Sequence, residues 1–302
     1  MTGPCIGVDV GGTSVRAAVV DADGTVIDQR QSDTPVERTA AEAEIAGVIT
    51  DLAAKHPVRA VGLAIAGFVS ADMSRVMFAP HLAWRNAPVA DLIAARVGLP
   101  VVMDHDVNCA AWAEHTLGAA ASARVSLTVA IGTGIGAGLV VDGTLYRGAH
   151  GVAPELGHLA VIPAGRACAC GNRGCLERYV SLEALRRRGI PDAQWLGEIE
   201  PVFGSAITVI ENLFDPQTII LGGMAPEPLL QGLAALAERL PGSVSARSDR
   251  TAPRLLVAHG GQNSVLSGAA ALAVLGTLSP RHGQMFGTAS EAGAPQAGDI
   301  AA

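Results

Sequence analysis

Aromatic side chains are scarce in this chain. Phe, Trp and Tyr make up only 3% of the 302 residues, although apolar residues as a class make up 49%. Ala, Val, Leu and Ile must therefore build the core. The scarcity argues against a sugar-binding platform of aromatic rings and against a surface on which nucleic-acid bases stack.

Charge is also sparse. Charged residues make up 16% of the sequence, and the formal net charge is −7 at pH 7. This acidic balance argues against nucleic-acid and anionic-membrane partners, because both carry negative charge. The apolar fraction excludes an intrinsically disordered chain, and the length allows one large domain or two small ones.

Long apolar segments are lacking where a targeting or membrane segment would be expected. The N-terminus has neither a basic region nor an extended apolar run, so we expect no signal peptide and a cytoplasmic protein. The uncharged stretch 260–280 is long enough to consider as a membrane span, but Gln262, Asn263 and several glycines interrupt it. A buried helix over residues 264–275 is the better interpretation.

Cysteines are few and unevenly spaced. Three of the five are grouped as Cys168, Cys170 and Cys175, whereas Cys5 and Cys109 stand alone among apolar residues. An odd number in this arrangement argues against a disulfide framework.

The cysteine group has a histidine upstream, at His158. Three thiolates and one imidazole form a set of ligands suited to tetrahedral Zn²⁺. Because the protein would fill all four positions, the ion would be structural and would not activate water. Free thiols beside an unrelated histidine are the alternative.

Glycine is the residue in excess, with 36 copies, which predicts tight turns or loops that approach a ligand closely. One such group follows Asp9 and consists of Gly11, Gly12 and Thr13. Backbone N–H groups in this turn can face phosphate oxygens, and the Asp9 carboxylate can hold Mg²⁺ through water. An ordinary hairpin turn is the alternative.

Two further glycine groups strengthen the phosphate interpretation. Gly132, Thr133 and Gly134 lie between two predicted strands, a context unlike that of a Walker loop or a dinucleotide fingerprint. Two turns between strands, each with glycines and a threonine, indicate two loops that bind one polyphosphate chain. Gly222 and Gly223 follow a buried strand and are consistent with a nucleoside site or with a simple turn.

Strand and helix patterns alternate along the chain and predict an α/β fold. The expected strands are 6–9, 15–20, 25–29, 59–66, 101–104, 127–131, 137–141 and 218–220, and the expected helices are 39–55, 88–96, 108–117 and 264–275. AVVDADGT at 18–25 is similar to LVVDGT at 139–144, which indicates an internal duplication. We predict a smaller N-terminal lobe over 1–120, a larger C-terminal lobe over 121–278 and a loosely ordered tail over 279–302.

Asp106 is the candidate acid-base residue. It follows the predicted buried strand 101–104, and ligands in α/β folds bind at the ends of such strands. A carboxylate there can accept the proton of a hydroxyl group that attacks a γ-phosphate. Capping of the following helix by Asp106 is the alternative.

These motifs, in this order, resemble the ROK family of sugar kinases and related repressors, within the actin-like ATPase superfamily. DVGGTSVR at 9–16 is similar to the first phosphate motif of that family and GTGIGAG at 132–138 to the second. YRGAHGVAPELGH at 146–158 is similar to the family signature, and CACGNRGCLE at 168–177 to the zinc loop. The similarity extends from residue 5 to about residue 275.

The resemblance implies a two-lobed, internally duplicated actin-like ATPase fold, related to ribonuclease H, with a cleft between the lobes. It implies ATP-dependent phosphorylation of a hexose at its 6-hydroxyl, with Mg²⁺ and structural Zn²⁺ as cofactors, in a homodimer or homotetramer. The zinc loop favours ATP over polyphosphate as the donor. Glucose is the favoured sugar, and N-acetylmannosamine, N-acetylglucosamine, mannose and fructose are the alternatives. A catalytically weakened sugar-binding protein is less favoured. A repressor is also less favoured, because a repressor of this family would carry a DNA-binding domain before Asp9.

The resemblance also assigns roles to residues. Asp106 would be the catalytic base, and His158 would use one ring nitrogen for zinc and the other for sugar. The implied sugar ligands are Gly67, His105, Asp106, Glu155, His158 and Glu177. The implied nucleotide ligands are Asp9, Gly11, Gly12, Thr13, Gly132, Thr133, Gly134, Gly222 and Gly223. The sequence departs from the family pattern at His105, where Asn is usual, at Pro154, where Gly is usual, and in AIAG at 64–67, where the family has Gly-x-Pro-Gly.

Overall fold

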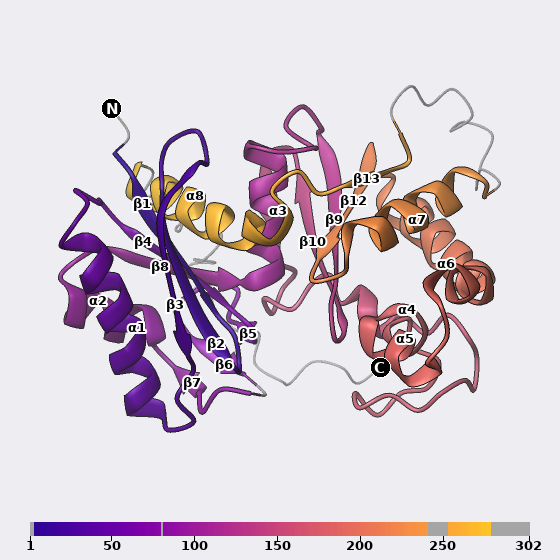
Figure 1. The fold of residues 1–302 in the computed structure, drawn as a ribbon, viewed down its shortest axis with the longest axis horizontal. Coiled ribbons are helices and arrows are strands. Elements are labelled where there is room, and N and C mark those ends of the chain that lie inside the picture. Colours follow the sequence, from indigo (N-terminus) through magenta and orange to yellow (C-terminus); the bar gives the residue numbers. More distant parts are fainter. Residues whose placement is uncertain (1–2, 80, 241–252, 279–302) are drawn as a thin grey trace, which may run out of the picture.

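The computed structural model describes residues 3–79, 81–240 and 253–278. Within these ranges, two five-stranded sheets have the strand orders β3-β2-β1-β4-β8 and β11-β10-β9-β12-β13 (Figure 1). The strands of the first sheet are β1 (Cys5–Val10), β2 (Ser14–Val20), β3 (Val26–Asp33), β4 (Val61–Ile65) and β8 (Val101–His105). Those of the second are β9 (Val125–Ile131), β10 (Ile135–Val141), β11 (Thr144–Tyr146), β12 (Thr218–Gly223) and β13 (Leu255–Val257).

The two sheets repeat one topology. In the first, β1 is antiparallel to β2 and parallel to β4. In the second, β9 is antiparallel to β10 and parallel to β12. Each sheet is therefore a three-stranded meander extended by two parallel strands, which confirms the predicted α/β fold and its internal duplication.

Helices cover both faces of the first sheet. Alternate residues of a strand point to opposite faces, so Ile6 and Val8 pack with Ile45 of α1 (Arg38–Ala53), whereas Cys5 packs with Leu266 of α8 (Ser264–Leu278). Helix α2 (Val89–Val97) lies on the α1 side and ends at Gly98 in the left-handed conformation, as the sequence predicts. Gly7 and Gly62 permit the close approach of α8, because a Cβ at either position would collide with its backbone.

The second sheet is also covered on both faces. One face packs on the largest core cluster, which includes residues of α6 (Asp192–Phe214) and α7 (Glu227–Glu238). Helix α3 (Asp106–Thr116) leaves the end of β8 and packs against β9 and β10. Helices α3 and α8 thus cross between the two sheets in opposite directions and contact each other (Figure 1).

Several elements lie where the sequence predicts none. They are the small sheet of β5 (Phe68–Val69), β6 (Val76–Phe78) and β7 (Arg85–Ala87), the 3-10 turns over Leu156–His158 and Gly261–Asn263, and the short helices α4 (Glu177–Val180) and α5 (Leu182–Arg188), together with β11, α6, α7 and β13. The predicted helix 108–117 begins two residues earlier, at Asp106.

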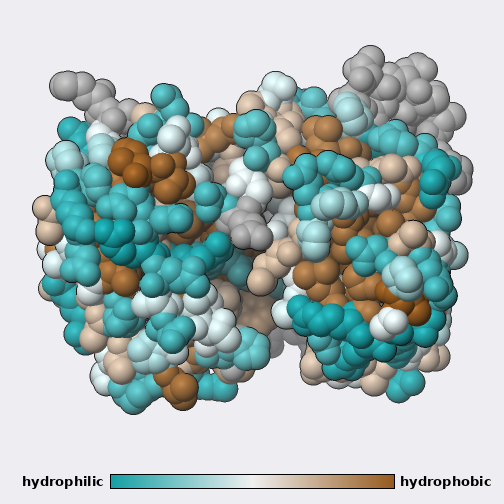
Figure 2. All heavy atoms as spheres, viewed as in Figure 1, coloured by the Kyte–Doolittle hydropathy of each residue, from teal (hydrophilic) through white to brown (hydrophobic). Residues whose placement is uncertain are grey.

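The division into lobes 1–120 and 121–278 stays a prediction, and the predicted tail 279–302 lies outside the described residues. Figure 2 shows a hollow on this face of the molecule between the half that contains β1–β8 and the half that contains β9–β13. Among the described residues, no helix combines the length and the apolar character needed to cross a membrane.

Candidate active site

Asp106 lies at the junction of the two halves, where β8 ends and α3 begins. Its side chain is 36% exposed, and its Oδ1 lies 3.2 Å from Nε2 of His105. The backbone N–H of Val107 donates to the same oxygen at 2.7 Å. Asp106 is the first helical residue and His105 is the cap, so the carboxylate lies at the positive end of the helix dipole.

Asp104, two residues earlier, has the opposite environment. It is 2% exposed and accepts hydrogen bonds from the Asn108 side chain at 2.8 Å and from Nε of Arg147 at 2.9 Å. Arg147 follows β11 in the second half, so this ion pair joins the two halves directly behind Asp106. Sequence reasoning missed the pair, although Arg147 lies inside the family signature and Asp104 at the end of the predicted strand.

The first phosphate loop connects β1 and β2. Asp9 and Arg16 are cross-strand partners, and Nη2 of Arg16 donates to Oδ2 of Asp9 at 2.6 Å. Burial raises the pKa of Asp9, and the nearby Asp106 carboxylate adds to this effect, whereas Arg16 opposes it. The loop closes through the Gly11 N–H, which donates to the Ser14 carbonyl at 3.0 Å.

Gly12 and Thr13 complete this loop. A Cβ at Gly12 would collide with the side chain of His81, and Thr13 is exposed. The structure thus brings the first glycine group and Asp9 close to Asp106, because both parallel strands β1 and β4 and their neighbour β8 end at the same edge of the sheet.

The second and third glycine groups lie side by side. Gly222 pairs with Ala130 and Gly223 with Ile131 across the parallel strands β12 and β9, immediately before the loop that contains Gly132, Thr133 and Gly134. The N–H of Gly132 donates to the Gly134 carbonyl at 2.9 Å, and Thr133 is exposed. Gly223 has φ of +95°, and a Cβ there would lie 2.6 Å from the Ile131 nitrogen. The predicted nucleotide residues therefore form two groups, one on each sheet.

The predicted sugar ligands of the second half lie together. Oε2 of Glu155 is 3.8 Å from Nε2 of His158, and Oε1 of Glu177 is 3.8 Å from Nδ1 of the same ring. Burial raises the pKa of Glu155; the neighbouring His105 and His158 oppose the shift, and the carboxylates of Glu177 and Asp106 add to it. Glu155 is therefore within electrostatic reach of the other four side chains.

Two further residues of the predicted site are Gly134 and Gly67. A Cβ at Gly134 would lie 3.0 Å from Oε2 of Glu177, so the second glycine loop borders the carboxylate group. Gly67 follows β4, whose last residue Ile65 pairs with His105, and it packs against Ala79.

The histidine and cysteine group forms a compact cluster. The four ligand atoms of His158, Cys168, Cys170 and Cys175 all lie within 4.8 Å of one another. Nδ1 of His158 is 3.6 Å from Sγ of Cys168, and Sγ of Cys170 is 3.7 Å from Sγ of Cys175. Ligands about 2.3 Å from a tetrahedral zinc ion are about 3.7 Å apart, so the donor set and its spacing fit Zn²⁺.

Cys168 connects this cluster to Glu177. Burial raises the pKa of the Cys168 thiol to about 12, and Sγ of Cys168 donates to Glu177 at 3.1 Å. Thiols of this kind become thiolates when a metal ion binds. Gly171 and Gly174, both with positive φ, fold the loop around the cluster. The other cysteines, Cys5 and Cys109, are buried and separate.

The ROK family model matches residues 5–275 of this chain. The chain belongs to the ROK family. This result confirms the resemblance seen in the sequence, and the family includes both kinases and repressors.

Three relatives illustrate that range. The chain is 41% identical to a glucokinase of Streptomyces coelicolor over 185 residues, which cover 61% of this chain and 58% of that protein. It is 30% identical over 245 residues to a xylose repressor of Bacillus spizizenii, with 72% of this chain and 64% of the repressor covered. A solved ROK glucokinase from Streptomyces griseus, in complex with glucose and AMPPNP, has a TM-score of 0.74 at 31% identity and covers 91% of this chain and 100% of its own. The shared fold confirms the predicted two-lobed architecture.

Proposed function

We propose that this chain is a hexose kinase that transfers the γ-phosphoryl group of ATP to the 6-hydroxyl group of a hexose, with glucose as the preferred sugar. One observation carries the proposal. Asp106 is a partly exposed carboxylate at the junction of the two halves, and its charge acts both on Asp9, beside the first glycine loop, and on Glu155, in the group with His158 and Glu177. The glucokinase relatives support the choice of glucose.

Asp106 would act as the base. The sugar 6-oxygen forms a bond to the γ-phosphorus, the bond from that phosphorus to the bridging β–γ oxygen breaks, and the hydroxyl proton passes to the Asp106 carboxylate. Oδ1 is already held by Val107 and His105, which fixes the direction of the carboxylate. Oriented positioning of this kind supplies much of the rate in phosphoryl transfer.

The glycine loops would bind the nucleotide. The backbone N–H groups at Gly11–Thr13 and Gly132–Gly134 are the candidate phosphate donors, and Gly222 and Gly223 border the candidate nucleoside site. Asp9 is the candidate holder of Mg²⁺, which neutralises phosphate charge when bound. Without a cation, Arg16 supplies the neutralising charge to Asp9.

Glu155, His158 and Glu177 would bind the sugar hydroxyls. Carboxylates accept hydrogen bonds from hydroxyl groups, and this mode of recognition needs no aromatic platform. His158 points Nδ1 at Cys168 and Nε2 at Glu155, so the cysteine cluster would orient a sugar-binding ring. Gly67 and His105 would close the same site on the first half, and His105, in place of the usual Asn, would influence the choice of sugar.

The assembly and the location are part of the same proposal. We infer a homodimer or homotetramer that works in the cytoplasm, with lobes over 1–120 and 121–278. Light scattering of the purified chain tests the oligomeric state, which we expect to be two or four copies.

A coupled phosphorylation assay tests the proposed function. The purified chain is supplied with glucose, mannose, fructose, N-acetylglucosamine or N-acetylmannosamine, and with ATP or polyphosphate as donor. We expect ATP-dependent turnover with the highest kcat/KM for glucose. Turnover with a different sugar would change the substrate assignment, and the absence of turnover with every pair would overturn the kinase assignment.

A further inference from the structure

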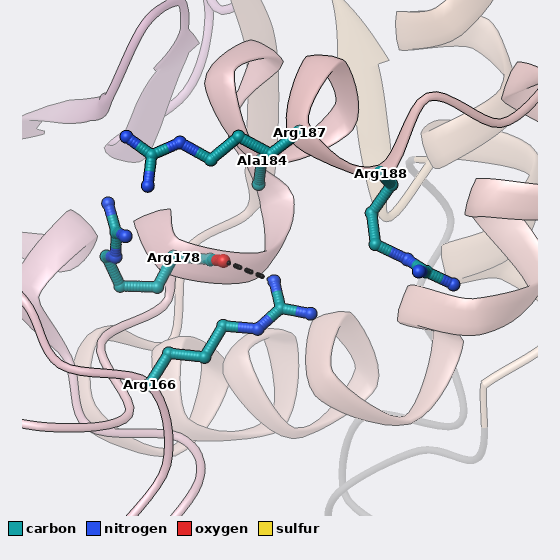
Figure 3. A pocket seen from close by; sticks show the side chains of 5 residues that line it. All are labelled: Arg166, Arg178, Ala184, Arg187 and Arg188. Atoms are coloured by element: carbon teal, nitrogen blue, oxygen red, sulfur yellow. Dashed lines mark hydrogen bonds between the residues drawn. The ribbon is translucent and has the colours of Figure 1, made fainter.

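A second charged cavity lies in the C-terminal half, and none of its lining residues belongs to the candidate active site. It has a volume of about 250 Å³ and is lined by Arg166, Arg178, Ala184, Arg187 and Arg188 (Figure 3). Four of the five lining residues are arginines, in a chain whose net charge is −7. The cavity therefore concentrates positive charge on an acidic protein.

Three separate segments supply these arginines. Arg166 belongs to the loop that leads into the cysteine cluster, Arg178 to α4, and Arg187 and Arg188 to α5. In Figure 3, Arg178 and Arg187 extend their guanidinium groups to one side of the cavity, and Arg188 extends to the other. The last turn of α5 favours cations because of the helix dipole, but this effect does not explain Arg166 and Arg178.

Arg166 is held rigidly at the cavity. Its Nη1 donates to the Arg178 carbonyl at 2.9 Å, and its backbone N–H donates to the Tyr179 hydroxyl at 2.8 Å. The guanidinium carbon also lies 4.7 Å from the centre of the Tyr179 ring. The position of this positive charge is thus fixed before any ligand binds.

The acidic groups nearby neutralise only part of the charge. Glu183 accepts from Nε of Arg187 at 2.7 Å, and Glu198 binds Arg188 through both oxygens. Within the described part of the chain, neither Arg166 nor Arg178 forms an ion pair, and the buried Nε of Arg178 has no hydrogen-bond partner. A buried donor without a partner is unfavourable, and so is the mutual repulsion of grouped guanidinium groups. An anion in the cavity would relieve the repulsion among the guanidinium groups.

We propose that this cavity binds a small phosphate-bearing anion with at least two negative charges. Guanidinium groups match phosphate oxygens with paired N–H donors, and several arginines around one cavity favour a multiply charged ligand. Inorganic di- or polyphosphate and a sugar phosphate share this chemistry. Arg178 directly follows Glu177, and Arg166 precedes Cys168 by two residues, so the bound anion would bridge the cysteine loop and α4.

Isothermal titration calorimetry with inorganic pyrophosphate tests the site on the full chain. An excess of a non-hydrolysable ATP analogue is present throughout to occupy the cleft, and no turnover is required, so failure of this test is distinct from failure of the kinase assignment. We expect one saturable site, weakened about tenfold or more by Arg178→Gln and by Arg187→Gln, because each removes charge-assisted hydrogen bonds. Arg187 is exposed, so its variant keeps the test valid if Arg178→Gln fails to fold.

Arg186→Gln is the matched control. Arg186 lies on the same helix and also binds Glu183, but it does not line the cavity. We expect its variant to keep the wild-type affinity. The proposal is overturned if the wild-type chain shows no saturable binding, or if Arg186→Gln weakens binding as much as the two cavity variants do.

Titrations with glucose 6-phosphate and citrate identify the ligand class. Tighter binding of pyrophosphate assigns the site to a di- or polyphosphate, and tighter binding of glucose 6-phosphate assigns it to a sugar phosphate. Citrate that binds as tightly as either would overturn the phosphate assignment.

Discussion

The two glycine loops have the same place in the duplicated topology but different surroundings. The β1–β2 loop follows Asp9, which is paired with Arg16 and lies close to Asp106. The β9–β10 loop has no acid at the matching strand end and instead borders Glu177, which accepts a hydrogen bond from Cys168 of the cysteine cluster. One backbone plan thus carries two kinds of chemistry. In the proposed function, the first half would supply the acids for the cation and the proton, and the second half the ligands for the sugar hydroxyls and for zinc.

Asp104 and Asp106, the two carboxylates at the end of β8, also differ in their surroundings. Asp104 is buried, paired with Arg147 and bound to Asn108, whereas Asp106 is half-exposed and faces the cleft residues. Burial and pairing fix Asp104 as a structural link between the halves. Exposure leaves Asp106 accessible to a substrate.

The largest effect is expected for Asp106→Asn. The amide keeps the size and hydrogen bonds of the side chain but cannot accept the proton, so kcat should fall by about a thousandfold. Sugar affinity, measured by calorimetry, should change little. If the variant kept a substantial part of the wild-type kcat, Asp106 would not be the base, and Asp104 and Asp106 would not differ in role as proposed.

Arg147→Gln tests Asp104 as the structural partner. Removal of the arginine leaves a buried carboxylate without its counter-ion, which should lower the free energy of unfolding by about 3 kcal/mol. Urea denaturation followed by circular dichroism measures the change. Arg124→Gln, which breaks the exposed pair with Asp142, is the control and should leave the midpoint unchanged. Equal urea midpoints for the wild-type chain, Arg147→Gln and Arg124→Gln would contradict the structural role of the Asp104–Arg147 pair.

Cys170→Ser tests the soft-metal side of the comparison. Cys170 is exposed, so its loss should leave the fold intact while metal retention falls about tenfold or more. Zinc content after dialysis against a chelator, measured by atomic emission, reports the change. Cys5→Ala, at a cysteine remote from the cluster, should keep the wild-type content. A wild-type chain that binds no zinc would refute the site.

The smallest effect is expected for Asp9→Asn, and it depends on pH. Burial raises the pKa of Asp9 in the folded chain, so folding favours the protonated form. That contribution to stability is complete below the pKa of the unfolded chain and is lost as pH rises through the folded value. Asp9→Asn should therefore raise Tm slightly at pH 7 and leave it unchanged at acid pH, as thermal scans at both pH values would show. A lower Tm at pH 7 would mean that the Arg16 pair outweighs burial.

Local patterns in the sequence predict much of the fold. Apolar runs identify β1, β4, β8 and β12, and the repeated VVD turn identifies the duplication, because each signal lies within a few residues. The packing of α8 on the first sheet could not be predicted in this way. It depends on the close fit of a distant helix against Gly7 and Gly62, which no local pattern encodes.

The candidate site, too, is only partly predictable from the sequence. Asp9, Asp106, the glycine loops and the cysteine cluster are recognisable because each motif is continuous or nearly so. The Arg147–Asp104 pair and the arginine cavity join residues from separate elements, so only the folded chain brings them together. Contacts set by topology are the part that sequence reasoning missed.

Transfer of labelled phosphate from ATP to glucose tests whether the chain phosphorylates the sugar at its 6-hydroxyl. The wild-type chain is incubated with glucose and ATP labelled at the γ-phosphate, and the product is identified by NMR. We expect the label on the 6-oxygen of glucose, with one ADP formed for each sugar phosphate. Release of ADP without any labelled sugar, or label on another oxygen, would contradict this expectation.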